Sequence, residues 1–278
     1  MKARLYSNTD VINRKSVMIK YLTLPFCLGF LSIVQLSAQR VPGQSYFSKN
    51  KYIEYIAGDI PIILVSPHGG ELSPDSLPTI HSRGNDRGSR ETTLSLMDSI
   101  NAQTGGCKPH VIINHVHTSK LNMARSKDSA GINAAALEAW DVFHSFIDEA
   151  KAKVSQTWQK GHYFEMHGNG RVAKWNEIGL GVSKEYLNHS DSAILTRLSK
   201  STIKNMADSS NFIELVRGST SLGGLLQGKG WKSTPSPVHP TPGANFFYAG
   251  WNTWKHGSRY SGTIDATHIE NYYHICPK

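Results

Sequence analysis

The strongest constraint on this chain is a pair of segments in which a strand-like run ends in a loop of ionisable residues and glycine. Residues 61–65 read PIILV, and the polar loop that follows holds His68 and Glu71. Residues 161–166 read GHYFEM, and His167 with another glycine follows. A continuously apolar strand is typical of a sheet covered on both faces. In open α/β sheets, ligands bind at the carboxyl ends of such strands.

Strands and helices alternate along the chain. We predict strands over residues 52–56, 61–65, 111–116, 161–166, 178–182 and 263–271, and helices over residues 91–100, 132–158, 190–206 and 219–226. Residues 229–262 are rich in glycine, proline and aromatic residues and are predicted to form a long loop. The pattern predicts an α/β fold, a three-layer sandwich in which a mixed, mostly parallel sheet is flanked by helices.

The N-terminal segment has the composition of a secretory signal. Lys15 and Lys20 precede the apolar residues 21–34, and small residues end the segment at Ala38. We therefore predict a signal peptide over residues 1–38, with Met18 as an alternative start, and one domain over 39–278. A membrane anchor is the alternative, but the run is shorter than the ~20 residues that a spanning helix needs. The protein is thus expected to be exported, either periplasmic or secreted, without a membrane span after cleavage.

The net charge restricts the class of partner, and the cysteine count allows a disulfide. The net charge of +9 falls to +5 when residues 1–38 are removed, because they carry five Lys/Arg and one acid. This mild, diffuse excess favours anionic small molecules or peptides and argues against nucleic acid as a partner. Cys107 and Cys276 remain in the exported chain, either as a disulfide or as two thiols.

The two ionisable loops carry residue types that suit zinc. Catalytic zinc sites hold three nitrogen or oxygen ligands from the protein and leave a position for water. His68, Glu71 and His167 supply such a set. Glu165 and His167 point to the same face of their strand, so Glu165 could orient the His167 ring as an outer partner. Acidic residues at Asp86 and Glu91 precede a predicted helix, where capping and dipole effects explain them.

Four segments together resemble the N-formylglutamate amidohydrolase family, within the zinc carboxypeptidase and aspartoacylase superfamily. They are residues 67–71 (PHGGE), 122–125 (NMAR), 165–167 (EMH) and 268–271 (HIEN), and the resemblance covers about residues 60–275. The second segment departs from the family pattern, because Asn122 stands for an Asp and Ala124 for an Asn.

The resemblance implies a zinc-exopeptidase-like fold and one Zn²⁺ ion held by His68, Glu71 and His167. It also implies Glu270 as the general base and Arg125 as a grip on a substrate carboxylate. Glu214 is the alternative base, and Asn122 and Lys120 are further candidates for substrate binding. The expected reaction is hydrolysis of an amide bond next to a free carboxylate, in an N-acyl amino acid, a peptide or a cell-wall fragment. A metallo-carboxypeptidase and a non-catalytic binding protein of the same fold are the alternatives.

Overall fold

The computed structural model describes residues 40–81, 84–170, 174–243 and 245–272. The predicted signal peptide over residues 1–38 lies outside this part of the chain, and so does Cys276. In the described part, no helix is long and apolar enough to cross a membrane.

The described residues form an eight-stranded sheet in the order β1-β2-β4-β3-β5-β8-β6-β7. Its strands are β1 Ser45–Phe47, β2 Ile53–Ile56, β3 Ile62–Ser66, β4 His110–Asn114, β5 Gly161–Asn169, β6 Asn176–Gly179, β7 Ser233–Thr234 and β8 Ile264–Tyr272. The four central strands β4, β3, β5 and β8 are parallel to one another. Antiparallel pairs occur at β1–β2, β2–β4 and β6–β8. The sheet is therefore mixed and mainly parallel, as predicted.

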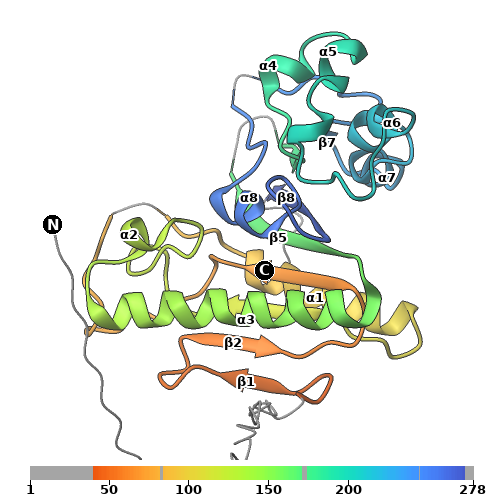
Figure 1. Ribbon diagram of the computed structural model, residues 1–278. Helices are drawn as coiled ribbons and strands as arrows, with labels where there is room; N and C mark the ends of the chain where they lie inside the picture. The colour runs from red at the N-terminus through yellow and green to blue at the C-terminus, as the bar shows by residue number, and fades with distance from the viewer. Residues whose placement is uncertain (1–39, 82–83, 171–173, 244, 273–278) are drawn as a thin grey trace, which may run out of the picture. The chain divides into compact units, whose positions relative to one another are not determined.

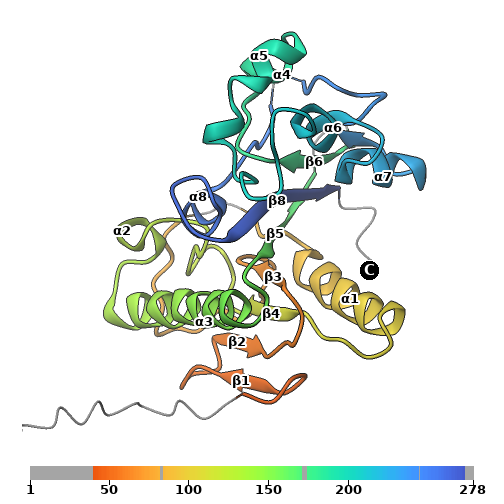
Figure 2. The same cartoon turned by 45° about the vertical axis from the view of Figure 1, so that its right-hand side comes forward.

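Eight α-helices accompany the sheet in the described part of the chain. They are α1 Ser89–Gln103, α2 Lys127–Ala130, α3 Ala134–Trp158, α4 Lys184–Leu187, α5 Asp191–Leu195, α6 Phe212–Arg217, α7 Leu222–Gly228 and α8 Trp251–His256. Of these, α1, α3 and α8 pack on the central strands of the sheet. Alternate residues of β3 pack in different cores: Ile63 lies in the core that holds Phe143 of α3, whereas Leu64 packs with Leu94 of α1. Figures 1 and 2 show α3 and α1 on opposite sides of these strands. This arrangement is the three-layer α/β sandwich that the sequence predicted.

Two predicted elements differ from the structure. The helix predicted over residues 190–206 is wrong, because only α5 and the short 3-10 helix η1 (Leu198–Lys200) form there. The main chain of Thr202 instead bonds Leu180 and Ala266, which draws it out of helical geometry. The loop predicted over residues 229–262 contains β7 and α8, and α8 packs against β8 and β5.

Candidate metal centre

The carboxyl ends of β3, β5 and β8 place ionisable side chains around one cavity. These strands are parallel, so their ends meet at the same edge of the sheet. His68 follows β3, while His167 and Glu270 lie near the ends of β5 and β8. All three side chains line a cavity of about 780 Å³. The topology thus brings residues 68, 167 and 270 to one place.

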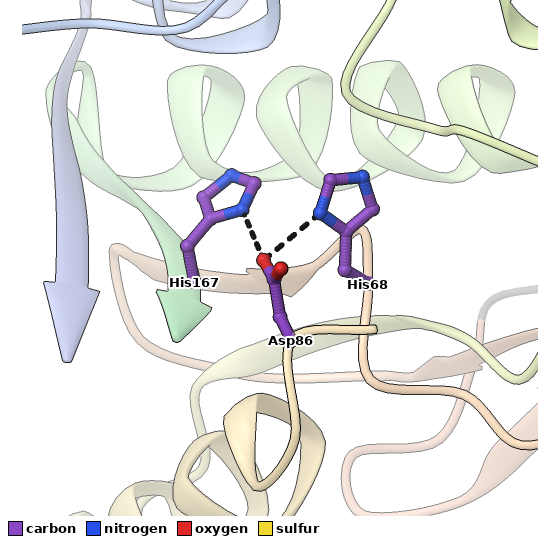
Figure 3. Close-up of side chains that lie close together, drawn as sticks. All are labelled: His68, Asp86 and His167. Atoms are coloured by element: carbon purple, nitrogen blue, oxygen red, sulfur yellow. Dashed lines mark hydrogen bonds and ion pairs between the residues drawn. The ribbon is translucent and has the colours of Figure 1, made fainter. Parts of the chain in front are cut away.

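His68, Asp86 and His167 form a compact group, here called the loop cluster. The Oδ2 atom of Asp86 lies 2.9 Å from Nδ1 of His68 and 2.8 Å from Nδ1 of His167. Figure 3 shows both imidazole rings turned toward this one carboxylate. The three candidate ligand atoms lie within 4.8 Å of one another, close enough to hold one metal ion. All three side chains are largely buried, with exposed fractions of 11%, 20% and 5%.

The outer contacts of the two rings decide which nitrogen faces the centre of the loop cluster. Oδ1 of Asn122 accepts a hydrogen bond from the main-chain N–H of Ala124, which identifies this atom as the amide oxygen. The same oxygen lies 2.9 Å from Nε2 of His68, so Nε2 of His68 is the donor. Nε2 of His167 lies 3.2 Å from Oε1 of Glu165 and donates in the same way. In the neutral rings, both Nδ1 lone pairs therefore face the Asp86 carboxylate.

Three electron-rich atoms that face one another need a cation or protons between them. Burial would raise the pKa of Asp86, but the charge of His68 and the hydrogen bond from His167 outweigh burial and lower it. Burial would lower the pKa of His167, but its hydrogen bonds to Asp86 and Glu165 raise it well above the ordinary value. A proton on the His167 ring satisfies its contact with Asp86. A divalent cation between the three side chains would replace this proton.

Two glycines shape the turn that carries His68. Gly69 has φ of +87°, a conformation that glycine adopts without strain. A side chain at Gly70 would meet the main chain of His115, because its Cβ would lie 2.1 Å from the carbonyl carbon. Asn85 then ties this turn to the Asp86 loop, since its amide accepts from the N–H of Gly69 and donates to the carbonyl of Gly70. The two loops are thereby fixed to each other.

The structure does not bring Glu71 into the loop cluster. Glu71 is exposed and is absent from the cavity wall. The chain has by then left the turn, because the N–H of Leu72 bonds the carbonyl of His115 and Leu72 pairs with Val116. Asp86 supplies the carboxylate that we expected from Glu71. No side-chain cap bond forms at the start of α1, so helix capping does not account for Asp86.

A second group, here called the strand cluster, consists of Glu165, His167, His268 and Glu270. Glu165 lies opposite His268 in the β5–β8 register, and His167 lies opposite Glu270. Glu165 is fully buried and accepts a hydrogen bond from Thr253 of α8 in addition to its contact with His167. Burial would raise its pKa, but the contacts with His167 and His268 lower it well below the ordinary value. Glu165 is thus an ionised partner of His167, in the position that the sequence suggested.

The remaining predicted residues divide between the cavity and the surface. Arg125 and Asn122 line the cavity, and the Arg125 side chain is exposed. Lys120 is half-buried and does not line the cavity. Glu214 lies outside the cavity wall, where its carboxylate accepts hydrogen bonds from Thr220. Geometry therefore favours Glu270 over Glu214 as the candidate base.

Sequence reasoning did not assign Asp86 or His268 to the site. Asp86 lies in a Gly-Asn-Asp-Arg-Gly segment just before α1, and no local pattern in that segment marks it as a ligand. His268 stands two residues before Glu270, at the spacing that puts both on one strand face. Residues 229–262, the predicted loop, also contribute three aromatic side chains to the cavity wall: Phe247, Trp251 and Trp254.

Comparisons with known proteins give likenesses to solved structures. No family model matches the chain, and no curated protein matches its sequence. The crystal structure of a gene product of Agrobacterium tumefaciens is similar, with 12% identity, a TM-score of 0.48, and coverage of 84% of this chain and 90% of that one. The N-formylglutamate amidohydrolase of Ralstonia eutropha is similar at 13% identity, with a TM-score of 0.47 and coverage of 78% and 82%. Membership of a family remains a prediction from the motifs.

Proposed function

We propose that this protein is a zinc-dependent hydrolase that cleaves an amide bond next to a free carboxylate. The observation that carries the proposal is the loop cluster, in which two imidazole lone pairs and one carboxylate oxygen face one another beside a large cavity. Export to the periplasm or the exterior belongs to the proposal as well. It rests on the composition of residues 1–38 alone.

The donor set of the loop cluster fits zinc. Two nitrogens and one carboxylate oxygen are the ligands of many catalytic zinc sites, which keep a further position open. Each ring also has the outer partner that ligating histidines usually have, Asn122 for His68 and Glu165 for His167. When bound, zinc would polarise the scissile carbonyl group and lower the pKa of water. The same donor types also bind cobalt, nickel and manganese.

Glu270 is placed to carry protons in this reaction. Glu270 lines the same cavity as the loop cluster, and its side chain is only 7% exposed. We assign it the role of general base: it accepts a proton from the attacking water and returns it to the departing amine. A C–O bond forms and the C–N bond breaks, which yields a carboxylic acid and an amine. His68, Asp86 and His167 would hold the metal ion.

The rest of the cavity suits a substrate with a carboxylate and a bulkier part. Arg125 lines the wall, and its guanidinium forms no ion pair with another residue of the described chain. A guanidinium pairs with a carboxylate through two parallel hydrogen bonds. Phe247, Trp251 and Trp254 supply an apolar wall. An N-acyl amino acid, a peptide or a cell-wall fragment has both features.

The test is a hydrolysis assay on the purified protein with a panel of N-acyl amino acids and short peptides. Release of formate or acetate indicates a deacylase, and release of a C-terminal amino acid indicates a carboxypeptidase. We expect activity that a chelator removes and zinc restores. Glu270→Gln should lower kcat at least about 100-fold because the general base is lost. Glu214→Gln, outside the cavity, is the matched control and should behave as wild type.

Two results would contradict this function. Equal activity of Glu270→Gln and wild type would show that Glu270 is not the general base. Tight binding of a carboxylate ligand without turnover of any member of the panel would favour the non-catalytic alternative.

A further inference from the structure

The register between β5 and β8 builds a two-by-two arrangement of carboxylates and imidazoles. Residues two apart on a strand point to the same face, and paired residues on neighbouring parallel strands lie side by side. Glu165 pairs with His268, and His167 pairs with Glu270. Each histidine of the strand cluster therefore has one glutamate along its own strand and another on the neighbouring strand.

His268 is enclosed on several sides. Its Nε2 atom lies 3.1 Å from Oε1 of Glu270, and its ring stacks on His167 with the centroids 4.6 Å apart. Its Nδ1 atom lies 3.8 Å from Oε2 of Glu165 and has no hydrogen-bond partner among the residues that the structure describes. A Cβ added to Gly250 would come within 3.3 Å of the same nitrogen, so the main chain approaches the ring closely there. The ring is thus held so that Nε2 points at Glu270.

We propose that His268 is a positioning residue for Glu270, an inference that rests on the general-base role given to Glu270 above. The Nε2–H of His268 donates to one carboxylate oxygen of Glu270 and leaves the other oxygen to face the cavity. Within the described part of the chain, His268 is the side chain that hydrogen-bonds this carboxylate. Fixing one oxygen limits the rotation of the Glu270 side chain and holds the base at one place in the wall of the cavity that the loop cluster also lines.

Three variants of His268 separate this role from simple packing. The amide nitrogen of glutamine can occupy the place of the imidazole Nε2, whereas the shorter asparagine places its amide nearer to Nδ1. His268→Ala and His268→Asn should lower kcat by about 10- to 100-fold with little change in KM, because the base is no longer oriented. His268→Gln should restore most of kcat. Bound zinc, measured on each variant, should stay near the wild-type amount.

Crystal structures of the three variants give a readout that does not depend on turnover. We expect the Glu270 carboxylate to keep its place in His268→Gln and to turn away in His268→Ala and His268→Asn. An unmoved Glu270 in His268→Ala would overturn the proposal, and so would equal kcat values for the Gln and Asn variants. If the wild type hydrolyses nothing, the proposed function fails, but the position of Glu270 in the crystals still decides the positioning role.

Discussion

The loop cluster and the strand cluster share His167 but are held by different kinds of structure. In the loop cluster, Asp86 lies in the loop before α1 and His68 in the turn after β3, and their spacing depends on hydrogen bonds between loops. In the strand cluster, the nine residue pairs between β5 and β8 fix the spacing. One site therefore combines two groups of side chains. The spacing of the strand cluster is set by local sheet geometry, and the spacing of the loop cluster is set by contacts between loops that are distant in the sequence.

The difference has a consequence for substitutions. A change in the loops should disturb the loop cluster and leave the strand cluster in register. A change in a hydrogen-bond partner at the sheet should alter function without moving the loops. The following variants separate the two regions, from the largest expected effect to the smallest.

Gly70→Ala should cause the largest loss, because the new Cβ would lie 2.1 Å from the main chain of His115 and must displace the turn that carries His68. We expect the free energy of unfolding to fall by about 3 kcal/mol, the upper end for forced overpacking. Bound zinc should fall with it. Urea denaturation and metal analysis measure the two effects. Gly243→Ala is the control, because a Cβ there meets open space, and equal behaviour of both variants would refute the account of the turn.

Asn122→Ala should weaken zinc binding by about 10- to 100-fold, the usual effect of removing an outer partner of a ligating histidine. The Nε2–H of His68 then loses its acceptor, and the ring is free to turn. Competition with a chromogenic chelator measures the affinity. Asn101→Ala on α1, outside the cavity wall, should bind zinc as wild type does. Unchanged affinity in Asn122→Ala would break the assignment of Nδ1 as the inward-facing nitrogen.

Arg125→Met should raise KM by about tenfold or more and change kcat little, because a charge-assisted hydrogen bond to the substrate is lost. Lys120→Met is the matched control, since Lys120 does not line the cavity. Steady-state kinetics on the best substrate of the panel distinguish them. A larger rise of KM in Lys120→Met than in Arg125→Met would show that the substrate carboxylate does not bind to Arg125.

The smallest effect is expected at Glu54, whose contact with His115 lies outside both clusters. The hydrogen bond from His115 lowers the pKa of Glu54 from 4.5 against the opposing effect of burial. Because the folded pKa is depressed, the stabilisation is present above about pH 4.5 and is lost as the pH falls through the folded pKa. Glu54→Gln should therefore cost under about 1 kcal/mol at neutral pH and nothing at low pH. Thermal melts across this range, with zinc content unchanged, measure it.

The sequence carried enough information to predict the strand-based part of the site. Apolar runs and the spacing of His167 from Glu165 predicted β3, β5 and their ligand-bearing ends, because the two-residue period of a strand is a local property. The convergence of His68, His167 and Glu270 followed from parallel strands ending at one edge.

The loop-based part could not be predicted because it depends on contacts that sequence distance hides. Glu71 stands three residues from His68, whereas Asp86 stands eighteen residues away and reaches the loop cluster through the hydrogen bonds of Asn85. The helix predicted near Thr202 failed for a related reason, since main-chain bonds to Leu180 and Ala266 override local propensity.

The most direct test compares the zinc content of Asp86→Asn and Glu71→Gln with that of wild type, measured by mass spectrometry of the purified proteins. Both substitutions replace a carboxylate by an amide of the same shape, at a partly buried position (Asp86) and at an exposed position (Glu71). We expect about one zinc per chain in wild type and Glu71→Gln, and less than about a tenth in Asp86→Asn. Full zinc in Asp86→Asn together with loss in Glu71→Gln would contradict the metal centre described here.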